Sequence, residues 1–122
     1  MVRGGRVLLC RRPEGGHLAG HWEFPGGKVE EGEDAREALA REIREELNCG
    51  VAVGSALETV EFSYPEIEIR LQPFRCAIVD GEPRACHHEE IGWFNAAQVE
   101  VLGLAGADLV LWRRFSPALV ET

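Results

Sequence analysis

The segment from Ala35 to Leu47 constrains the fold most, because it has the spacing of an amphipathic helix. Its apolar residues recur every four positions and form one stripe: Leu39, Ile43 and Leu47. Asp34, followed three residues later by Glu37, resembles a capping box, and Asn48 and Gly50 are typical of a helix end. The stripe must be buried against another layer, so the segment predicts a helix packed on a sheet.

Short apolar runs predict strands at residues 6–12, 56–63, 66–79 and 91–94. The second and third runs are expected to form a hairpin joined at Tyr64 and Pro65. Two more helices are expected, a short one opened by Asn95 with Gln98 and a last one opened by Asp108 that ends near residue 116. Strands and helices do not alternate regularly. The pattern therefore predicts an α+β fold in one domain over residues 1–122, with helices covering a central mixed sheet.

The charge and composition exclude several classes of protein. A net charge of −8 argues against a surface that holds a nucleic acid polymer, although acidic proteins can bind phosphates through a divalent cation. The apolar runs are too short to span a bilayer and no signal segment opens the chain, so we expect a cytoplasmic protein without membrane contact. The cysteines form no CxxC pair and are expected to be reduced thiols: Cys10, Cys49, Cys76 and Cys86.

Three carboxylates gather on one face of the expected helix. Glu45 and Glu46 follow Glu42 by three and four positions, which places all three within an arc of roughly 100°. A bound Mg²⁺ or Mn²⁺ would offset the repulsion between them, because hard cations prefer oxygen ligands. The alternative is a solvated acidic face balanced by neighbouring arginines. The preceding loop favours the metal site, because Gly26 and Gly27 allow close backbone approach to a ligand.

The spacing from Gly27 onward is a longer motif. Gly27 is followed after five residues by Glu33, and after seven more by the run REIREELNC at residues 41–49. This pattern closely resembles the Nudix box of the Nudix hydrolases, with Asn48 where the family has glycine. The run WEFPGGK at residues 22–28, the RRP at residues 11–13 and Trp93 resemble the MutT-type branch of that family.

The resemblance implies a Nudix α/β/α sandwich that hydrolyses a nucleoside diphosphate linked to another group. Typically such an enzyme cuts a nucleoside triphosphate to the monophosphate and pyrophosphate. It also implies a set of catalytic and metal-binding groups, namely the carboxylates of Glu42, Glu45 and Glu46 and the backbone carbonyl of Gly27. Glu33 and Arg41 are implied to form a structural pair that fixes the loop on the helix.

The general base is the position where this chain departs from the branch. MutT-type enzymes often have a glutamate six residues before the tryptophan, and here that position is His87. Glu46 or Glu45 is therefore the first expectation for the base, and Glu89 or Glu90 the second. The alternative for His87 and its neighbour His88 is that both are exposed loop residues.

The branch also implies which residues contact the substrate: Arg12, His17, Phe24, Tyr64 and Asp108. Structural alternatives exist for most of them. Arg12 can be a solvated charge at a strand end, Tyr64 and Phe24 can be packing residues, and Asp108 can be the N-cap of the last helix.

The expected function is hydrolysis of a nucleoside triphosphate by a monomer or homodimer, with 8-oxo-dGTP as the leading candidate. A pyrophosphohydrolase acting on CTP or a related pyrimidine nucleotide is the nearest alternative. A degenerate Nudix module that binds a nucleotide and regulates a partner is an alternative of another class.

Overall fold

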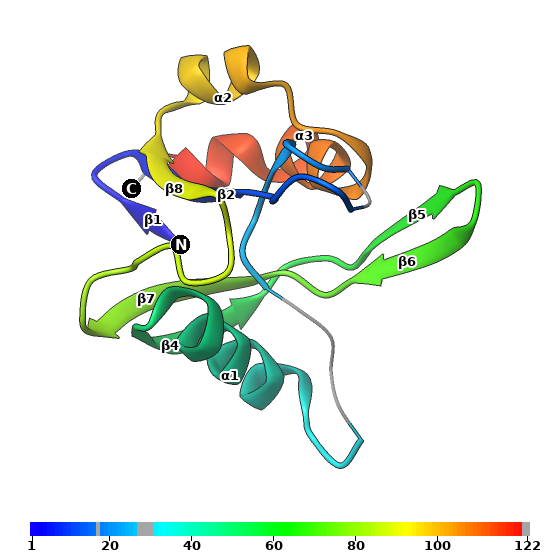
Figure 1. Ribbon diagram of the computed structural model, residues 1–122. Helices are drawn as coiled ribbons and strands as arrows, with labels where there is room; N and C mark the ends of the chain where they lie inside the picture. The colour runs from blue at the N-terminus through cyan, green and yellow to red at the C-terminus, as the bar shows by residue number, and fades with distance from the viewer. Residues whose placement is uncertain (17, 27–30, 121–122) are drawn as a thin grey trace.

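The computed structural model describes residues 1–16, 18–26 and 31–120, so His17 and Gly27 lie outside the described residues. The elements follow one another along the chain as labelled in Figure 1: β1 (Val2–Arg3), β2 (Arg6–Arg11), β3 (Trp22–Glu23), α1 (Ala35–Leu47), β4 (Gly50–Ala56), β5 (Val60–Tyr64), β6 (Ile67–Leu71), β7 (Phe74–Asp80), β8 (Glu90–Phe94), α2 (Ala96–Leu102) and α3 (Gly106–Val120).

Strand β2 is the centre of the main sheet. It pairs with β8 along one edge, and with the two short strands β1 and β3 at opposite ends of the other edge. Two further ladders, β4 with β7 and β5 with β6, complete the strand pairing of the described residues, and every recorded pair is antiparallel. Gly4 and Gly5 make the β1–β2 turn with φ of 58° and 74°, a conformation that favours glycine.

The alternation of β2 creates a core on each of its faces. Leu8 and Cys10 point toward α1, whereas Val7 and Leu9 point toward α2 and α3, and all four are at most 1% exposed. Successive residues of a strand face opposite sides of a sheet, so one strand serves both cores. The result is the layered arrangement of Figure 1, with α1 on one side of β2 and α2 with α3 on the other.

Helix α1 has the predicted bounds. Its N-cap Asp34 accepts a hydrogen bond from the backbone N–H of Glu37 at 2.8 Å, which satisfies one of the free donors of the first turn. The helix ends at Asn48, which has a left-handed φ of 52°. Asparagine tolerates this conformation better than most residues, so it can replace the glycine of the motif at this position.

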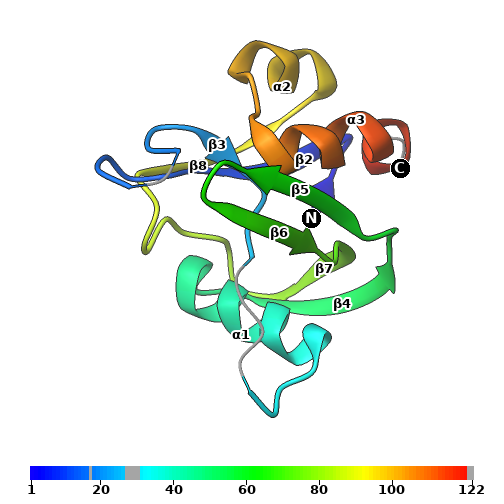
Figure 2. The same ribbon diagram turned by 90° about the vertical axis from the view of Figure 1, so that its right-hand side faces the viewer.

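The predicted bounds of the two long strands were wrong. Residues 66–79 form two strands, β6 and β7, with a break at Gln72 and Pro73, because proline has no N–H to donate to a ladder. The strand expected at residues 56–63 corresponds to β5 but was predicted to begin too early, and β4, which pairs with β7, was missed. The hairpin itself is confirmed as β5 and β6, which project from the body of the molecule (Figure 1) and lie beside α3 (Figure 2).

The helices near the C-terminus test two capping predictions. Asn95 and Gln98 form the full capping box of α2, with reciprocal bonds of 2.8 and 2.9 Å. Helix α3 begins at Gly106 instead of Asp108 and continues to Val120, past the predicted end at residue 116. Asp108 is therefore in the first turn, and its interpretation as the N-cap was wrong.

Candidate active site

The loop before α1 is joined to the helix by an ion pair with two contacts. Arg41 Nε lies 2.7 Å from Glu33 Oε2, and Arg41 Nη2 lies 3.0 Å from Glu33 Oε1. Such a paired arrangement of guanidinium and carboxylate is geometrically selective and stronger than a single contact. This is the contact that the resemblance implied, and its importance for activity stays a prediction.

The third guanidinium nitrogen of Arg41 is shared by two helix carboxylates. Its Nη1 lies 3.0 Å from Glu42 Oε1 and 3.3 Å from Glu45 Oε2. Among the residues that the structure describes, no group of three or more carboxylate, imidazole or thiol side chains converges closely enough to hold a metal ion. Arg41 thus neutralises part of the negative charge for which the sequence predicted a cation.

Glu46, unlike Glu42 and Glu45, forms no ion pair with Arg41 among the described contacts. Its side chain is partly buried, and burial raises its pKa to about 7, with the neighbouring Glu42 and Glu23 adding to the rise and His88 opposing it. Its Oε2 is buried and has no hydrogen-bond partner among the described atoms. A buried carboxylate oxygen without a donor fits a divalent cation, because hard cations bind such oxygens directly.

A second polar cluster lies beside Glu46 and was not predicted. Glu23, at the end of β3, binds Arg12 Nη1 through Oε1 and His88 Nε2 through Oε2, each at 2.9 Å. Burial alone would raise the pKa of Glu23, but the hydrogen bonds from His88 and Arg12 lower it below its usual value. Glu23 belongs to the WEFPGGK run that resembles MutT-type enzymes, so that motif indicated a functional position, whereas a single glutamate in a strand did not.

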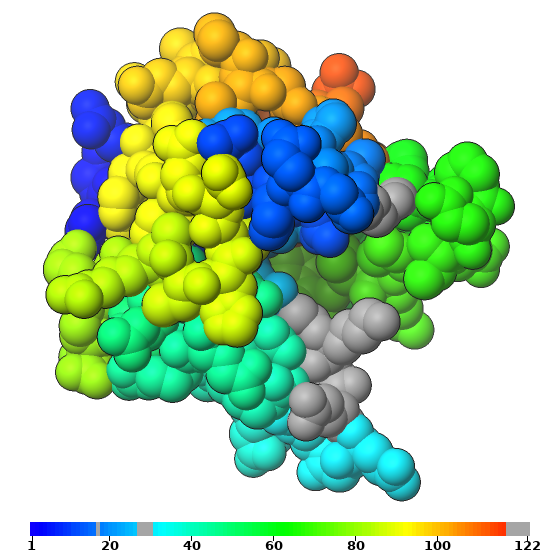
Figure 3. Space-filling view, viewed as in Figure 1, coloured from blue at the N-terminus to red at the C-terminus, as the bar shows by residue number. Residues whose placement is uncertain are grey.

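The loop at residues 81–89 brings His88 to the site. Its backbone is bound to α1 and β2 through the N–H groups of Arg84, Cys86 and Glu89, at 2.8–3.1 Å from carbonyl oxygens of Leu47, Glu46 and Arg11. In Figure 3 this yellow segment lies between α1 and the blue segment near β2.

Within that loop, neighbouring residues differ in exposure. The side chain of His88 is 6% exposed, so its interpretation as an exposed loop residue was wrong. His87 is exposed, as are Glu89 and Glu90, and Glu90 forms an ion pair with Arg11 at 3.1 Å. The exposed interpretation therefore holds for His87, and a role for Glu89 or Glu90 as the base stays a prediction.

Asp108 connects the first turn of α3 to the strand that carries Glu23. Its Oδ1 accepts a hydrogen bond from the backbone N–H of Phe24 at 3.1 Å. Burial raises the pKa of Asp108 to about 7, with the charge of Glu23 contributing, against the opposing hydrogen bond from Phe24. Trp22 and Phe24 pack against the α3-side core, so both aromatic side chains contribute to packing.

Tyr64 serves the start of α3. Its hydroxyl oxygen accepts a hydrogen bond from the backbone N–H of Ala107 at 3.1 Å, and its ring lies 4.8 Å from that of Phe62 in an edge arrangement. The hydroxyl satisfies a free donor of the first helical turn, as a capping side chain would. This contact supports the packing interpretation of Tyr64, and its role in substrate binding stays a prediction.

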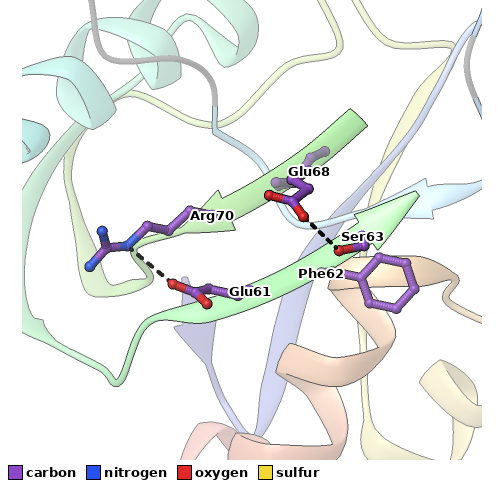
Figure 4. A pocket seen from close by; sticks show the side chains of 6 residues that line it. Glu61, Phe62, Ser63, Glu68 and Arg70 are labelled. Atoms are coloured by element: carbon purple, nitrogen blue, oxygen red, sulfur yellow. Dashed lines mark hydrogen bonds and ion pairs between the residues drawn. The ribbon is translucent and has the colours of Figure 1, made fainter. Parts of the chain in front are cut away.

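A hollow of about 390 Å³ lies on the β5–β6 hairpin, away from this cluster. Figure 4 shows its polar lining, where Arg70 approaches Glu61 at 3.9 Å and Ser63 approaches Glu68 at 3.5 Å. The lining has two carboxylates and one guanidinium, which faces Glu61, so it has no excess positive charge to select an anionic substrate.

The layered fold, the loop joined to a glutamate helix and the partly buried Glu46 define a hydrolase of the Nudix class. The chain belongs to the Nudix family, since the model of the NUDIX domain matches residues 1–114. It is a MutT-type member and an enzyme that acts on pyrophosphate bonds. Nudix hydrolases generally use divalent metals.

Two relatives extend over most of the chain. The CTP pyrophosphohydrolase of Escherichia coli is 35% identical over 113 residues, covering 93% of this chain and 84% of its own. A Mycobacterium tuberculosis protein provisionally named 8-oxo-dGTP diphosphatase 2 is 39% identical over 112 residues, covering 88% of this chain and 77% of its own.

Solved structures agree with the fold. The E. coli ORF135 protein superposes with a TM-score of 0.82 at 34% identity, covering 95% of this chain and 83% of its own. The MutT NUDIX hydrolase of Burkholderia pseudomallei superposes with a TM-score of 0.80 at 31% identity, covering 93% and 90%. None of the described helices combines the length and apolarity needed to cross a bilayer.

Proposed function

We propose that this chain hydrolyses a nucleoside triphosphate to the monophosphate and pyrophosphate in a reaction that needs Mg²⁺, or Mn²⁺ in its place. The leading substrate is an oxidised purine nucleotide such as 8-oxo-dGTP, removed from the cytoplasmic nucleotide pool by a monomer or homodimer. The observation that carries the proposal is Glu46, whose buried Oε2 has no donor among the described atoms and lies in a cluster of carboxylates.

The helix carboxylates have the chemistry to hold the cation. Glu42, Glu45 and Glu46 would supply oxygen ligands, with the carbonyl of Gly27 as a further one. When bound, the cation neutralises the polyphosphate and lowers the pKa of an attacking water. Arg41 would keep its two contacts with Glu33 and give up its shared contact with Glu42 and Glu45.

Glu46 is also the first choice for the general base. In the metal-free protein the pKa of Glu46 is about 7, a value suited to accepting a proton near neutral pH, and a cation bound to this carboxylate would lower it. The proton leaves the attacking water, whose oxygen forms the new bond to phosphorus while the phosphoanhydride oxygen departs. No covalent enzyme intermediate is required.

Two groups support recognition of the nucleobase of the substrate. Asp108 and the backbone of Phe24 lie together at the first turn of α3, and a carboxyl with a pKa of about 7 can donate or accept a hydrogen bond near neutral pH. A purine edge presents both donors and acceptors. The second candidate substrate is CTP, supported by the CTP pyrophosphohydrolase relative, which covers most of both chains.

A panel of nucleoside triphosphates with Mg²⁺ and product analysis tests the proposal. We expect the highest kcat/KM for 8-oxo-dGTP, with monophosphate and pyrophosphate as products. A preference for CTP would select the second candidate. Release of orthophosphate alone, or no turnover of any diphosphate derivative, would contradict the proposal. Nucleotide binding without turnover, unaffected by replacing Glu45 with glutamine, would indicate a regulatory module instead.

A further inference from the structure

We propose that Glu23 and His88 form a positioning pair, which presents Nδ1 of His88 as a hydrogen-bond acceptor to the water shell of the divalent cation beside Glu46. The inference rests on the proposed function, because it assigns a role in binding the same cation. It identifies His88, instead of its neighbour His87, as the histidine of this loop that serves the site.

The contact with Glu23 fixes the tautomer of the imidazole. Both oxygens of Glu23 are engaged, one by Arg12 and one by His88 Nε2, each at 2.9 Å. An ionised carboxylate can only accept hydrogen bonds, and the lowered pKa of Glu23 keeps it ionised. Nε2 must therefore carry the hydrogen, and in the tautomer with hydrogen on Nε2 alone the lone pair is on Nδ1.

Nδ1 of His88 is buried and has no partner among the described atoms, in a side chain that is only 6% exposed. Glu46 Oε2 is likewise buried without a partner among the described atoms, and its carboxyl is close enough to His88 for the two groups to interact electrostatically. A buried polar atom without a hydrogen-bond partner destabilises the folded protein. Glu46 would bind the cation directly, and a water on that cation would have a hydrogen to donate to Nδ1 of His88.

The backbone of the loop holds His88 in place independently of its side chain. The N–H groups on both sides of His88, those of Cys86 and Glu89, donate to carbonyl oxygens of Glu46 and Arg11 at 3.1 and 2.9 Å. Replacing the imidazole should therefore change the acceptor while the loop stays attached to α1 and β2.

Nitrogen-15 NMR of the imidazoles in the metal-free wild-type protein tests the pair directly. We expect His88 in the tautomer with hydrogen on Nε2, and we expect Mg²⁺ to shift its Nδ1 resonance more than that of any other histidine. Hydrogen on Nδ1, or an Nδ1 resonance unchanged by saturating Mg²⁺, would overturn the inference.

The kinetic test uses His88→Gln, whose amide can still donate to Glu23 but offers no acceptor at the position of Nδ1. We expect kcat to fall about 30-fold with KM changed less than about threefold, as for other groups that orient metal ligands. The melting temperature should stay within about 3 °C, because the loop remains bound through its backbone. His21→Gln is the matched control, because His21 is exposed and its side chain, within the described part of the chain, bonds only to the local carbonyl of Leu18.

A kcat of His88→Gln within about threefold of wild type would overturn the inference, as would a larger loss in His87→Gln than in His88→Gln. If the wild-type protein hydrolyses no nucleotide, the proposed function fails. The tautomer and the response to Mg²⁺ then still decide whether the pair serves a cation.

Discussion

Replacing Glu46 with glutamine should stabilise the metal-free protein while it removes activity. Burial raises the pKa of Glu46 from 4.5 to about 7, so the folded state penalises the ionised form. A tenfold change in an acid dissociation constant corresponds to about 1.4 kcal/mol. After a discount for screening by water at this partly exposed group, ionised Glu46 destabilises the folded state by about 2 kcal/mol. For a chain of 122 residues this corresponds to a rise in melting temperature of about 8 °C at pH 8.

The pH dependence of that gain has a definite sign. A carboxyl with a raised folded pKa contributes its full stability below 4.5, where both states are protonated, and loses it as the pH rises through about 7. The advantage of Glu46→Gln should therefore be present at pH 8 and absent at pH 4.5. Calorimetry of both proteins in a chelator, at both pH values, measures it.

Glu45→Gln is the matched control, because the side chain of Glu45 is 54% exposed and, among the described residues, bonds only to the shared nitrogen of Arg41. It should leave the metal-free melting temperature within about 2 °C of wild type. Saturating Mg²⁺ should then stabilise the wild-type protein more than Glu46→Gln. In the chelator at pH 8, a melting temperature of Glu46→Gln equal to or below that of wild type would refute the reasoning.

Three further substitutions test other contacts. Asp108→Asn keeps an acceptor for the N–H of Phe24 but removes a carboxyl whose pKa burial raises from 3.8 to about 7. The substitution should therefore raise the metal-free melting temperature at pH 8 and not at pH 4. Equal effects at both pH values would contradict this prediction. Tyr64→Phe should lower the melting temperature by about 4 °C, because the N–H of Ala107 loses its acceptor, and a KM changed more than about twofold would instead show substrate contact. Arg41→Gln breaks the ion pairs with its glutamate partners and should cost about 2 kcal/mol in urea unfolding, whereas an unchanged midpoint would show that the pairs contribute nothing.

Local patterns predicted the elements that depend on neighbouring residues. Helix α1 has the bounds that the stripe and the Asp34 cap predicted, and the α2 capping box forms as expected from Asn95 and Gln98. The prediction that Asp108 is the N-cap of the last helix was wrong, because its carboxyl accepts a hydrogen bond from Phe24, which is distant in the sequence. Capping preferences act within one turn, so a contact between distant segments can override them.

The motif predicted the glutamates of the site but not their surroundings. The resemblance to the Nudix box implied that Glu33 pairs with Arg41, and the ion pair is present. It did not predict that Glu23 and His88 would meet, because that contact depends on how the loop at residues 81–89 packs against β3 and α1. Identical residue types at positions 87 and 88 have opposite exposures, a difference that tertiary packing alone determines.

The most direct test of the central claim is phosphorus-31 NMR of a nucleoside triphosphate hydrolysed in ¹⁸O-labelled water with Mg²⁺. The account predicts that monophosphate and pyrophosphate appear together, that one of them carries a single ¹⁸O, and that Glu46→Gln slows the reaction at least about 1,000-fold. Orthophosphate as the only product, or a Glu46→Gln rate within about tenfold of wild type, would contradict it.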